Sequence, residues 1–308
     1  MLACGAVVFV LSKRSTDITV GTTAPAVILA VLTLVGIGLM LAGKGLKESS
    51  GDLGQGIVVG VLVAVAIGWW QSQTQHTIDE AAQEQSLRLT LSFQRDLIGI
   101  DLRDKDLEGI YMRAKDLRGS DLRRARLESA DLTRSNLANA ILFRTRLDRA
   151  VFVHAHLQNA HLQSAEGRDA DFGWVTAPGM GLEGAHLPGA MFTGARLRGA
   201  YLEEAELDGA TFTGAHLEWV MALDVSLEEA HLENAHLEYA DLTSANLRGA
   251  NLFGADLTDA ELGGADLSGA DLREVTIRDA TFTDATFNSK THWPAGFDPA
   301  SAGAKEVS

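Results

Sequence analysis

Residues 240–272 read ADLTSANLRGANLFGADLTDAELGGADLSGADL, and a leucine stands at every fifth position of this stretch. The same register runs from Leu97 to Phe287, and 34 of its 39 positions hold Leu or Phe. The five exceptions are Met112, Gly167, Ala177, Ala222 and Ile277. From Ala125 onward, alanine dominates two places before each of these positions, commonly with Asp, Asn or His between them. A period of five residues therefore organises most of the chain.

A period of five excludes the common secondary structures. Five residues advance an α-helix by about 500°, so the leucines would spiral around it and form no apolar stripe. In a straight strand the side chains alternate with a period of two, and every second leucine would face the wrong way. A chain that turns one corner per repeat keeps every fifth side chain inside, and four corners close one coil. Such coils stack through backbone hydrogen bonds about 4.8 Å apart, so roughly ten coils make a rod of about 50 Å.

The signature seen in ADL at 240–242 and ANL at 245–247 resembles that of the pentapeptide-repeat proteins. The resemblance spans about 95–289 and implies an all-β repeat fold, the right-handed quadrilateral β-helix. It also implies that the central Leu or Phe and the Ala two places before it point inward, while the other three positions face solvent. The sequence THWPAGFDP within the tail at 290–308 is similar to the ending of some bacterial members. We expect Trp293 and Phe297 in this tail to cover the last coil.

Coil arithmetic predicts how the core is filled. Four phenylalanines fall in one column when the inward positions are spaced by twenty, and we expect their rings to stack as a ladder. They are Phe152, Phe172, Phe192 and Phe212.

Two stretches depart from the pattern. In the first coils, Lys105 and Lys115 occupy positions that hold alanine elsewhere, and an ammonium group inside an apolar core is unfavourable. We therefore expect a distorted first coil whose lysines reach the open end. The stretch from Glu166 to Gly181 contains Gly167 and Pro178, which predict a bulge or a protruding loop, with simple decay of the repeat as the alternative.

The N-terminal quarter predicts a membrane anchor. A short segment at 1–23 precedes an uncharged apolar run at 24–43, which is long enough as a helix to cross a bilayer. A second, glycine-rich span is predicted at 53–70 and ends in Trp69 and Trp70, as at an aromatic interfacial belt. The two spans would form a transmembrane helical hairpin. The predicted location is the cell membrane, multi-pass, with the repeats in the cytoplasm on the resemblance and on Lys13 and Arg14.

Residues 71–94 are predicted to form a linker and an N-terminal cap. The glutamine-rich part is either a polar connector or a short helix that Thr77 opens with Glu80 in a capping box. Leu87, Leu89, Leu91 and Phe93 alternate with polar residues, which predicts a strand over the open end of the first coil.

Charge narrows the range of partners. The net charge of −15 argues against direct nucleic-acid binding. Separately, the single cysteine, Cys4, excludes an intramolecular disulfide. Residues 95–150 carry 13 Lys and Arg against 10 Asp and Glu, whereas residues 151–289 carry 6 against 23. The arginines of the first part either rest against anionic headgroups or form mixed ion pairs on a solvated face. They are Arg113, Arg118, Arg123, Arg124, Arg126 and Arg134.

Candidate chemistry is sparse. His216 and His236 lie one coil apart, as do Glu218 with Glu238 and Trp219 with Tyr239, so a divalent metal between the imidazoles is one interpretation. The other is that His only fills the outward place usually held by Asp or Asn. No catalytic motif is present, and a solid rod offers no pocket. We therefore predict no enzyme, no cofactor, and no catalytic, cofactor-binding or metal residues.

The resulting functional expectation is a non-enzymatic, membrane-tethered scaffold or protein-interaction module. Its partners would be the membrane, through the hairpin, and an unknown protein. The alternative follows from the resemblance, because some pentapeptide-repeat proteins mimic DNA and bind a topoisomerase such as gyrase. The acidic segment at 151–289 fits that alternative. Members of the family often pair end to end, so a homodimer is a further possible outcome.

Overall fold

The computed structural model describes residues 52–307 and divides the chain into two units, Met1–Gln83 and Glu84–Ser308, which are described separately. The segments predicted at 1–23 and 24–43 lie outside the described residues. The helix α3 spans Asp52–Phe93 without a break and includes the segment predicted to span a membrane at 53–70. Over the described residues, the structure contains no helix that is both long and apolar enough to cross a bilayer. The membrane span predicted at 53–70 is therefore not supported.

Two predictions for the linker are wrong. No helix begins at Thr77, whose hydroxyl donates to the carbonyl of Thr74 (2.8 Å) in the middle of α3. Residues 87–93 are helical and form no strand, because an existing helix elongates without a new nucleation step. In a helix, Leu87 and Leu91 share one face, and Leu91 is fully buried against the repeats. The segment thus covers the first coil, as predicted, but through a helical pair of leucines.

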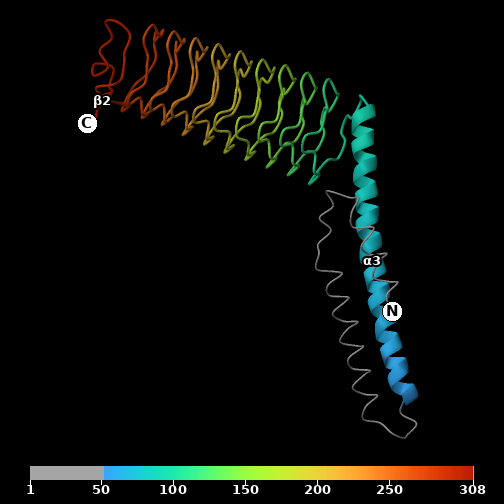
Figure 1. The fold of residues 1–308 in the computed structure, drawn as a ribbon. Coiled ribbons are helices and arrows are strands. Elements are labelled where there is room, and N and C mark those ends of the chain that lie inside the picture. Colours follow the sequence, from blue (N-terminus) through green and yellow to red (C-terminus); the bar gives the residue numbers. More distant parts are fainter. Residues whose placement is uncertain (1–51, 308) are drawn as a thin grey trace, which may run out of the picture. The chain divides into compact units, whose positions relative to one another are not determined.

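The repeats of the second unit form a stack of coils, drawn from green to red in Figure 1. Parallel bridges join residues twenty apart, from Asp96 with Asp116 to Asp266 with Thr286, so each coil contains four repeats of five residues. We number the positions of one repeat from the bridge residue: in Asp241-Leu242-Thr243-Ser244-Ala245 these are positions 1 to 5. Most side chains at positions 2 and 5 are buried along the stack, whereas most at positions 1, 3 and 4 reach the surface.

Each corner is a hydrogen-bonded turn. The amide of position 5 donates to the carbonyl of position 2 in the same repeat, as from Ala125 to Leu122 (2.9 Å). Every position 4 from Gly99 to Asp284 has φ between +51° and +74°, the left-handed region. The amides of positions 1, 2 and 4 donate to neighbouring coils, which leaves the amide of position 3 without a backbone acceptor.

The core confirms the predicted ladder. The rings of Phe152, Phe172, Phe192 and Phe212 stack with centroids 4.9, 4.9 and 4.8 Å apart and nearly parallel planes. Where Ala222 replaces the usual leucine, a cavity of about 20 Å³ remains, although Val220 and Val225 occupy neighbouring alanine positions. The interior is otherwise packed with Leu, Phe and Ala side chains that are buried almost completely.

The predicted distortion of the first coil is absent, because its lysines are accommodated without moving the backbone. Lys105 is exposed, and the first coil makes regular bridges to the second. Lys115 is buried, and its ammonium group donates to the carbonyls of Ser92 (2.8 Å) and Gln94 (2.5 Å) at the end of α3. These carbonyls have no partner within the helix, and they lie at the negative end of its dipole. Lys115 therefore fastens the helix end to the repeats.

The predicted bulge between Glu166 and Gly181 is also absent, and the bridges continue through this stretch. Pro178 occupies position 3, where the amide has no backbone acceptor to lose. Gly167 occupies an inward position where a Cβ would lie 2.7 Å from the Cβ of Leu147, so glycine fits the local spacing. Gly167 and Pro178 therefore stand at positions of the repeat where they do not disturb the coil.

The C-terminal tail covers the last coil, as predicted. Two short strands, β1 (Thr286–Phe287) and β2 (Lys305–Glu306), pair in parallel. Between them, Trp293 and Phe297 pack against each other and against Phe282, with ring centroids 5.1 to 5.5 Å apart. The aromatic cluster closes the core at this end.

Candidate functional surface

The surface of the stack is built by positions 1, 3 and 4 of each repeat. An Asp or Asn at position 1 accepts a hydrogen bond from the otherwise unpaired amide of position 3, as Asp256 does from Thr258 (2.9 Å) and Asp241 from Thr243 (3.0 Å). The two prolines at position 3, Pro178 and Pro188, have no such amide and follow Thr176 and His186 at position 1. The Asp or Asn of the signature is thus a turn cap.

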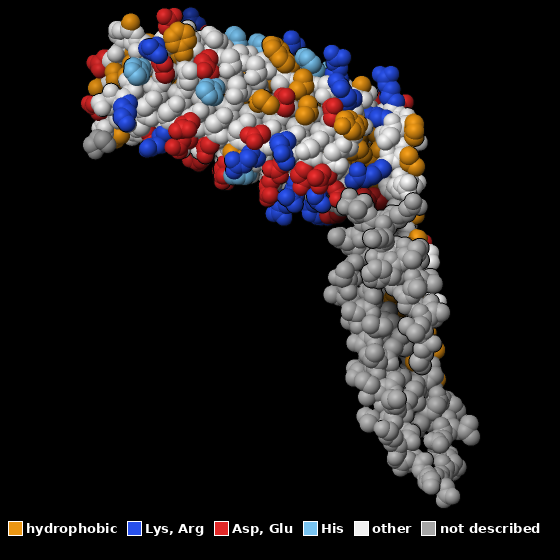
Figure 2. Space-filling view, in the orientation of Figure 1, with side chains coloured by type: hydrophobic (Ala, Val, Ile, Leu, Met, Phe, Trp, Pro, Cys, Tyr) orange, Lys and Arg blue, Asp and Glu red, His pale blue; other side chains and the backbone are white. Residues whose placement is uncertain are grey.

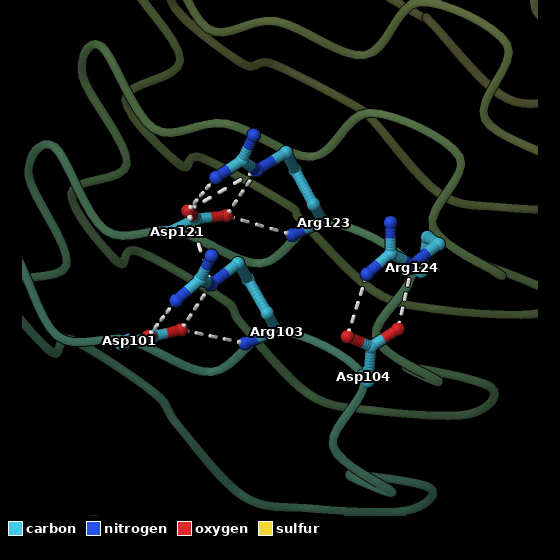
Figure 3. Close-up of polar contacts among 6 residues, drawn as sticks. All are labelled: Asp101, Arg103, Asp104, Asp121, Arg123 and Arg124. Carbon is cyan, nitrogen blue, oxygen red and sulfur yellow. Dashed lines mark hydrogen bonds and ion pairs between the residues drawn. The ribbon is translucent and has the colours of Figure 1, made fainter.

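Aspartate and arginine form planar forks on the N-terminal coils (Figure 3). Arg103 donates from Nε to Oδ1 of Asp101 (2.9 Å) and from its terminal amino group to Oδ2 (2.6 Å). Asp121 and Arg123 repeat this arrangement one coil later. A position 1 aspartate therefore binds both the backbone amide and the side chain of the residue two places on.

Ion pairs also join successive coils. Arg124 donates to both carboxylate oxygens of Asp104, twenty residues earlier, at 2.6 and 2.7 Å. Arg103 approaches Oδ2 of Asp121 at 3.6 Å, which links two forks. The first coils thus carry a network of fixed charges of both signs, and Figure 2 shows red and blue side chains crowded along the lower edge of this part.

The forks shift the protonation of their members. The hydrogen bonds from Arg103 lower the pKa of Asp101 from its ordinary value of 3.8 to about 2. The bond from Arg124 lowers the pKa of Asp104, and that from Arg123 lowers the pKa of Asp121. In return, the hydrogen bond to Asp101 raises the pKa of Arg103. These carboxylates remain charged well into the acid range.

The geometry favours one interpretation of the predicted arginine patch. Of its six members, Arg118, Arg123 and Arg124 form forks with aspartates, and Arg126 contacts three carboxylates. Arg113 lies 3.6 Å from Asp131. Most of the positive charge is thus already paired, which favours the mixed ion pairs over contact with headgroups.

A shallow, open groove of about 370 Å³ crosses these coils on one side. Both signs of charge line it, and one lining residue, Glu128, is buried and pairs with Arg146 (3.1 Å) and Arg126 (3.4 Å). The remaining lining residues are Glu108, Asp148, Arg149, Arg168 and Asp169. The groove is therefore a polar surface with little net charge.

The two candidate histidines lie side by side on successive coils, as the coil spacing predicts. The imidazoles of His216 and His236 stack with centroids 4.7 Å apart. Each ring faces the glutamate two residues later, at 3.2 Å for Glu218 and 3.4 Å for Glu238. Over residues 52–307, no group of three or more His, Cys, Asp or Glu side chains is arranged to hold a metal ion. The stacked histidines occupy position 1, which holds Asp or Asn in other repeats such as those of Asp241 and Asn246.

Comparison with known protein families shows which family the chain belongs to. The model for pentapeptide repeats matches eight copies, over 116–149, 145–176, 182–220, 224–252 and 250–288, which together cover more than half of the chain. The chain belongs to the pentapeptide repeat family. Membership supports the quadrilateral β-helix implied by the signature, and the match is to no enzymatic family. No curated protein sequence matches the chain.

Several solved pentapeptide repeat structures are similar to this one. HetL from the cyanobacterium Nostoc sp. strain PCC 7120, involved in heterocyst differentiation regulation, is 28% identical over 65% of this chain and 92% of its own, with a TM-score of 0.45. QnrB1, a plasmid-mediated fluoroquinolone resistance protein, is 17% identical over 69% and 89%, with a TM-score of 0.28. A thylakoid lumen protein of Arabidopsis thaliana is 25% identical over 49% and 70%, with a TM-score of 0.20.

Two features of the surface, the Asp–Arg forks and the anchoring role of Lys115, were not predicted from the sequence. The forks have a local signal, since Asp-Leu-Arg places opposite charges on the same side of one turn at 101–103, 116–118, 121–123 and 271–273. The anchoring role of Lys115 has no local signal, because its carbonyl partners lie more than twenty residues earlier in a segment predicted to be a strand.

Proposed function

We propose that this chain is a non-enzymatic interaction scaffold whose repeat coils present a fixed surface to a protein partner. The observation that supports it is the division of labour within each repeat: positions 2 and 5 fill the core, and positions 1, 3 and 4 form outer faces held by the turns. Outer residues therefore vary without altering the core. A rigid surface of this kind binds with little loss of conformational entropy.

The test is crosslinking of the full-length chain in its native cells, followed by identification of the captured proteins. The proposal expects one or a few proteins to be captured repeatedly and to bind the purified chain directly. A chain whose acidic outer residues between 201 and 241 are replaced by neutral ones serves as the control for surface dependence. Recovery of no specific partner in repeated experiments would count against a scaffold.

We further propose that the apolar run at 24–43 tethers the scaffold to the cell membrane, with the repeats on the cytoplasmic side. Twenty uncharged residues suit a membrane crossing, and Lys13 and Arg14 before the run favour a cytoplasmic N-terminus. The repeats share that side only if the chain crosses the bilayer a second time, at 53–70. A C-terminal reporter that is active on only one side tests the sidedness. Activity of a periplasmic reporter would contradict the cytoplasmic placement.

Mimicry of DNA is the second candidate, and the charge of residues 151–289 favours it. Carboxylates recur in the same column of successive coils, as with Glu183 and Glu203 or Glu218 and Glu238, in a segment with 23 acidic and 6 basic residues. A regular line of negative charge fits the basic groove of a topoisomerase such as gyrase. Purified chain would then change the rate of DNA supercoiling by gyrase, and an unchanged rate at high protein concentration would exclude this role.

End-to-end pairing of two copies is not proposed, because both ends of the stack are covered, one by Leu91 and the other by Trp293.

A further inference from the structure

Large apolar side chains gather on the outside of two successive coils. We call this surface the aromatic ledge, and its members are Tyr201, Trp219, Met221, Leu223 and Tyr239. Each is between 40% and 51% exposed, at positions where most other repeats have Asp, Asn, Gly or another polar residue. Trp, Tyr and Met are the residue types most enriched in protein interfaces.

Four members of the ledge are paired between the two coils, and Leu223 lies two residues after one of them, Met221. The rings of Trp219 and Tyr239 stack with centroids 4.2 Å apart and an angle of 8° between their planes. Tyr201 pairs with Met221 in the ladder between coils, and Met221 lies two residues after Trp219. In the preceding coil, Gly199 stands in the column of Trp219, and no atom lies within 4 Å of the place its Cβ would take. No side chain at that position covers the indole.

The backbone pays a conformational penalty for these rings. Trp219 and Tyr239 both have φ of +62°, a conformation that bulky residues rarely adopt and that glycine adopts at many equivalent positions. Their exposure means that they fill no core, and the fold is satisfied with glycine there. Trp219 and Tyr239 therefore add exposed aromatic area at positions where the fold requires no large side chain.

The charge around the ledge specifies the chemistry of that partner. From Tyr201 to Asp241 the chain has eleven Asp and Glu and no Lys or Arg, which resume only at Arg198 and Arg248. Glu218 and Glu238 directly precede the two stacked rings, and each directs one carboxylate oxygen to a neighbouring imidazole while its other oxygen is buried without a hydrogen-bond partner in the described structure. This surface repels nucleic acid and anionic lipid and attracts a cation.

We propose that the aromatic ledge binds an arginine-bearing segment of a partner protein. A guanidinium group stacks on the open face of an indole and donates to carboxylates in the same plane, which an ammonium group does less well. The apolar members accept the aliphatic stem of the arginine and its neighbours. This inference rests on the proposed scaffold and names the class of segment that the scaffold holds.

The test is a titration of the full-length chain with a short synthetic peptide in which arginine alternates with leucine, followed by isothermal titration calorimetry in every variant and by the indole NMR signal of Trp219 in the native chain. We expect saturable binding of the arginine peptide. Binding should weaken when lysine replaces arginine in the peptide, and it should disappear when glutamate replaces arginine. Trp219→Gly should weaken binding about tenfold or more, as for a central interface residue. Because this change relieves a strained φ, it should leave the fold intact, and the thermal unfolding midpoint verifies that.

Trp174→Gly is the matched control. Trp174 is also exposed, also has a positive φ, and lies alone over Gly194 on another column. Binding should be unchanged in this variant. Equal losses in the two variants, or equal binding of the glutamate peptide, would overturn the ledge as a site for arginine. If the partner found by crosslinking in cells is still captured by Trp219→Gly, the scaffold stands and only the ledge is rejected.

Discussion

At the scale of the residue, each repeat leaves one amide to be satisfied by a side chain. The amide of position 3 has no backbone acceptor, and an Asp or Asn at position 1 supplies one. The Asp or Asn between Ala and Leu in the signature is therefore a local cap of the turn, comparable to the cap of a helix. The contribution of such a cap is measurable where the amide is sheltered from water.

Asp256→Ala tests the cap. Asp256 accepts from the amide of Thr258 at 2.9 Å, and Thr258 is buried. We expect a loss of about 1 to 2 kcal/mol in the free energy of unfolding, measured by denaturant titration. Thr176→Ala is the matched control, because Thr176 precedes Pro178 at position 3 and caps no amide. A loss as large in the control would show that the cap is not the cause.

The Asp–Arg forks predict a dependence of stability on pH. Because the folded-state pKa of Asp101 is about 2, below its ordinary value of 3.8, the fork stabilises the fold above about pH 4. This stabilisation is lost as the pH falls from about 4 to about 2. The difference in melting temperature between the native chain and Arg103→Gln should therefore shrink over that range. Arg113→Gln, whose single contact to Asp131 is 3.6 Å long, should show little change, and a constant difference for Arg103→Gln would contradict the account.

At the scale of the element, the end of α3 is held to the first coils by the buried Lys115, by the packing of Leu91 and by a hydrogen bond from Arg88 to the carbonyl of Asp106 (3.0 Å). Lys115→Met keeps the aliphatic stem and leaves two carbonyls at the end of the helix without a donor. We expect a loss of about 1 to 3 kcal/mol and faster amide hydrogen exchange around residues 88–97. Lys105→Met, at an exposed position, should change stability by less than about 0.5 kcal/mol. Unchanged exchange in Lys115→Met would show that the lysine does not fasten the helix.

The phenylalanine ladder is the element that fills one column of the core. Phe172→Ala removes a fully buried ring between two stacked neighbours, and we expect a loss of about 3 to 5 kcal/mol by denaturant unfolding. Phe253→Ala, on the surface, should lose less than about 1 kcal/mol. A small loss at Phe172 would mean that the coils collapse around the missing ring.

The elements differ in how far their sequence predicts them. The coils and the ladder were predictable because packing dictates the inward positions at a fixed period, and Leu97 to Phe287 never leave it. The helical conformation of residues 87–93 was not predictable, because leucines at 87 and 91 suit one face of a helix as well as one face of a strand. The preceding helix determines that the segment is helical. Gly167 and Pro178 suggest irregularity by residue type, yet each stands at a position that tolerates it. The arginine forks were missed because only the turn geometry brings position 1 and position 3 together.

At the scale of the whole molecule, the sequence divides the charge unevenly along the repeats. The first coils have slightly more basic than acidic residues and pair most of them with each other, whereas residues 151–289 carry a large excess of carboxylates. A solid core with a patterned surface places function on the outer faces of the coils. The central claim is therefore that a protein partner binds a defined part of these faces.

The most direct test is site-resolved photocrosslinking of the full-length chain in its native cells. A photoreactive residue is placed in turn at each exposed position 3, where the backbone is not in the left-handed region and the ledge residues Trp219 and Tyr239 are retained. The account predicts that crosslinks to one protein cluster on adjacent coils of one or two columns, around Trp219 and Tyr239. Uniformly scattered crosslinks, or none at any position, would contradict it.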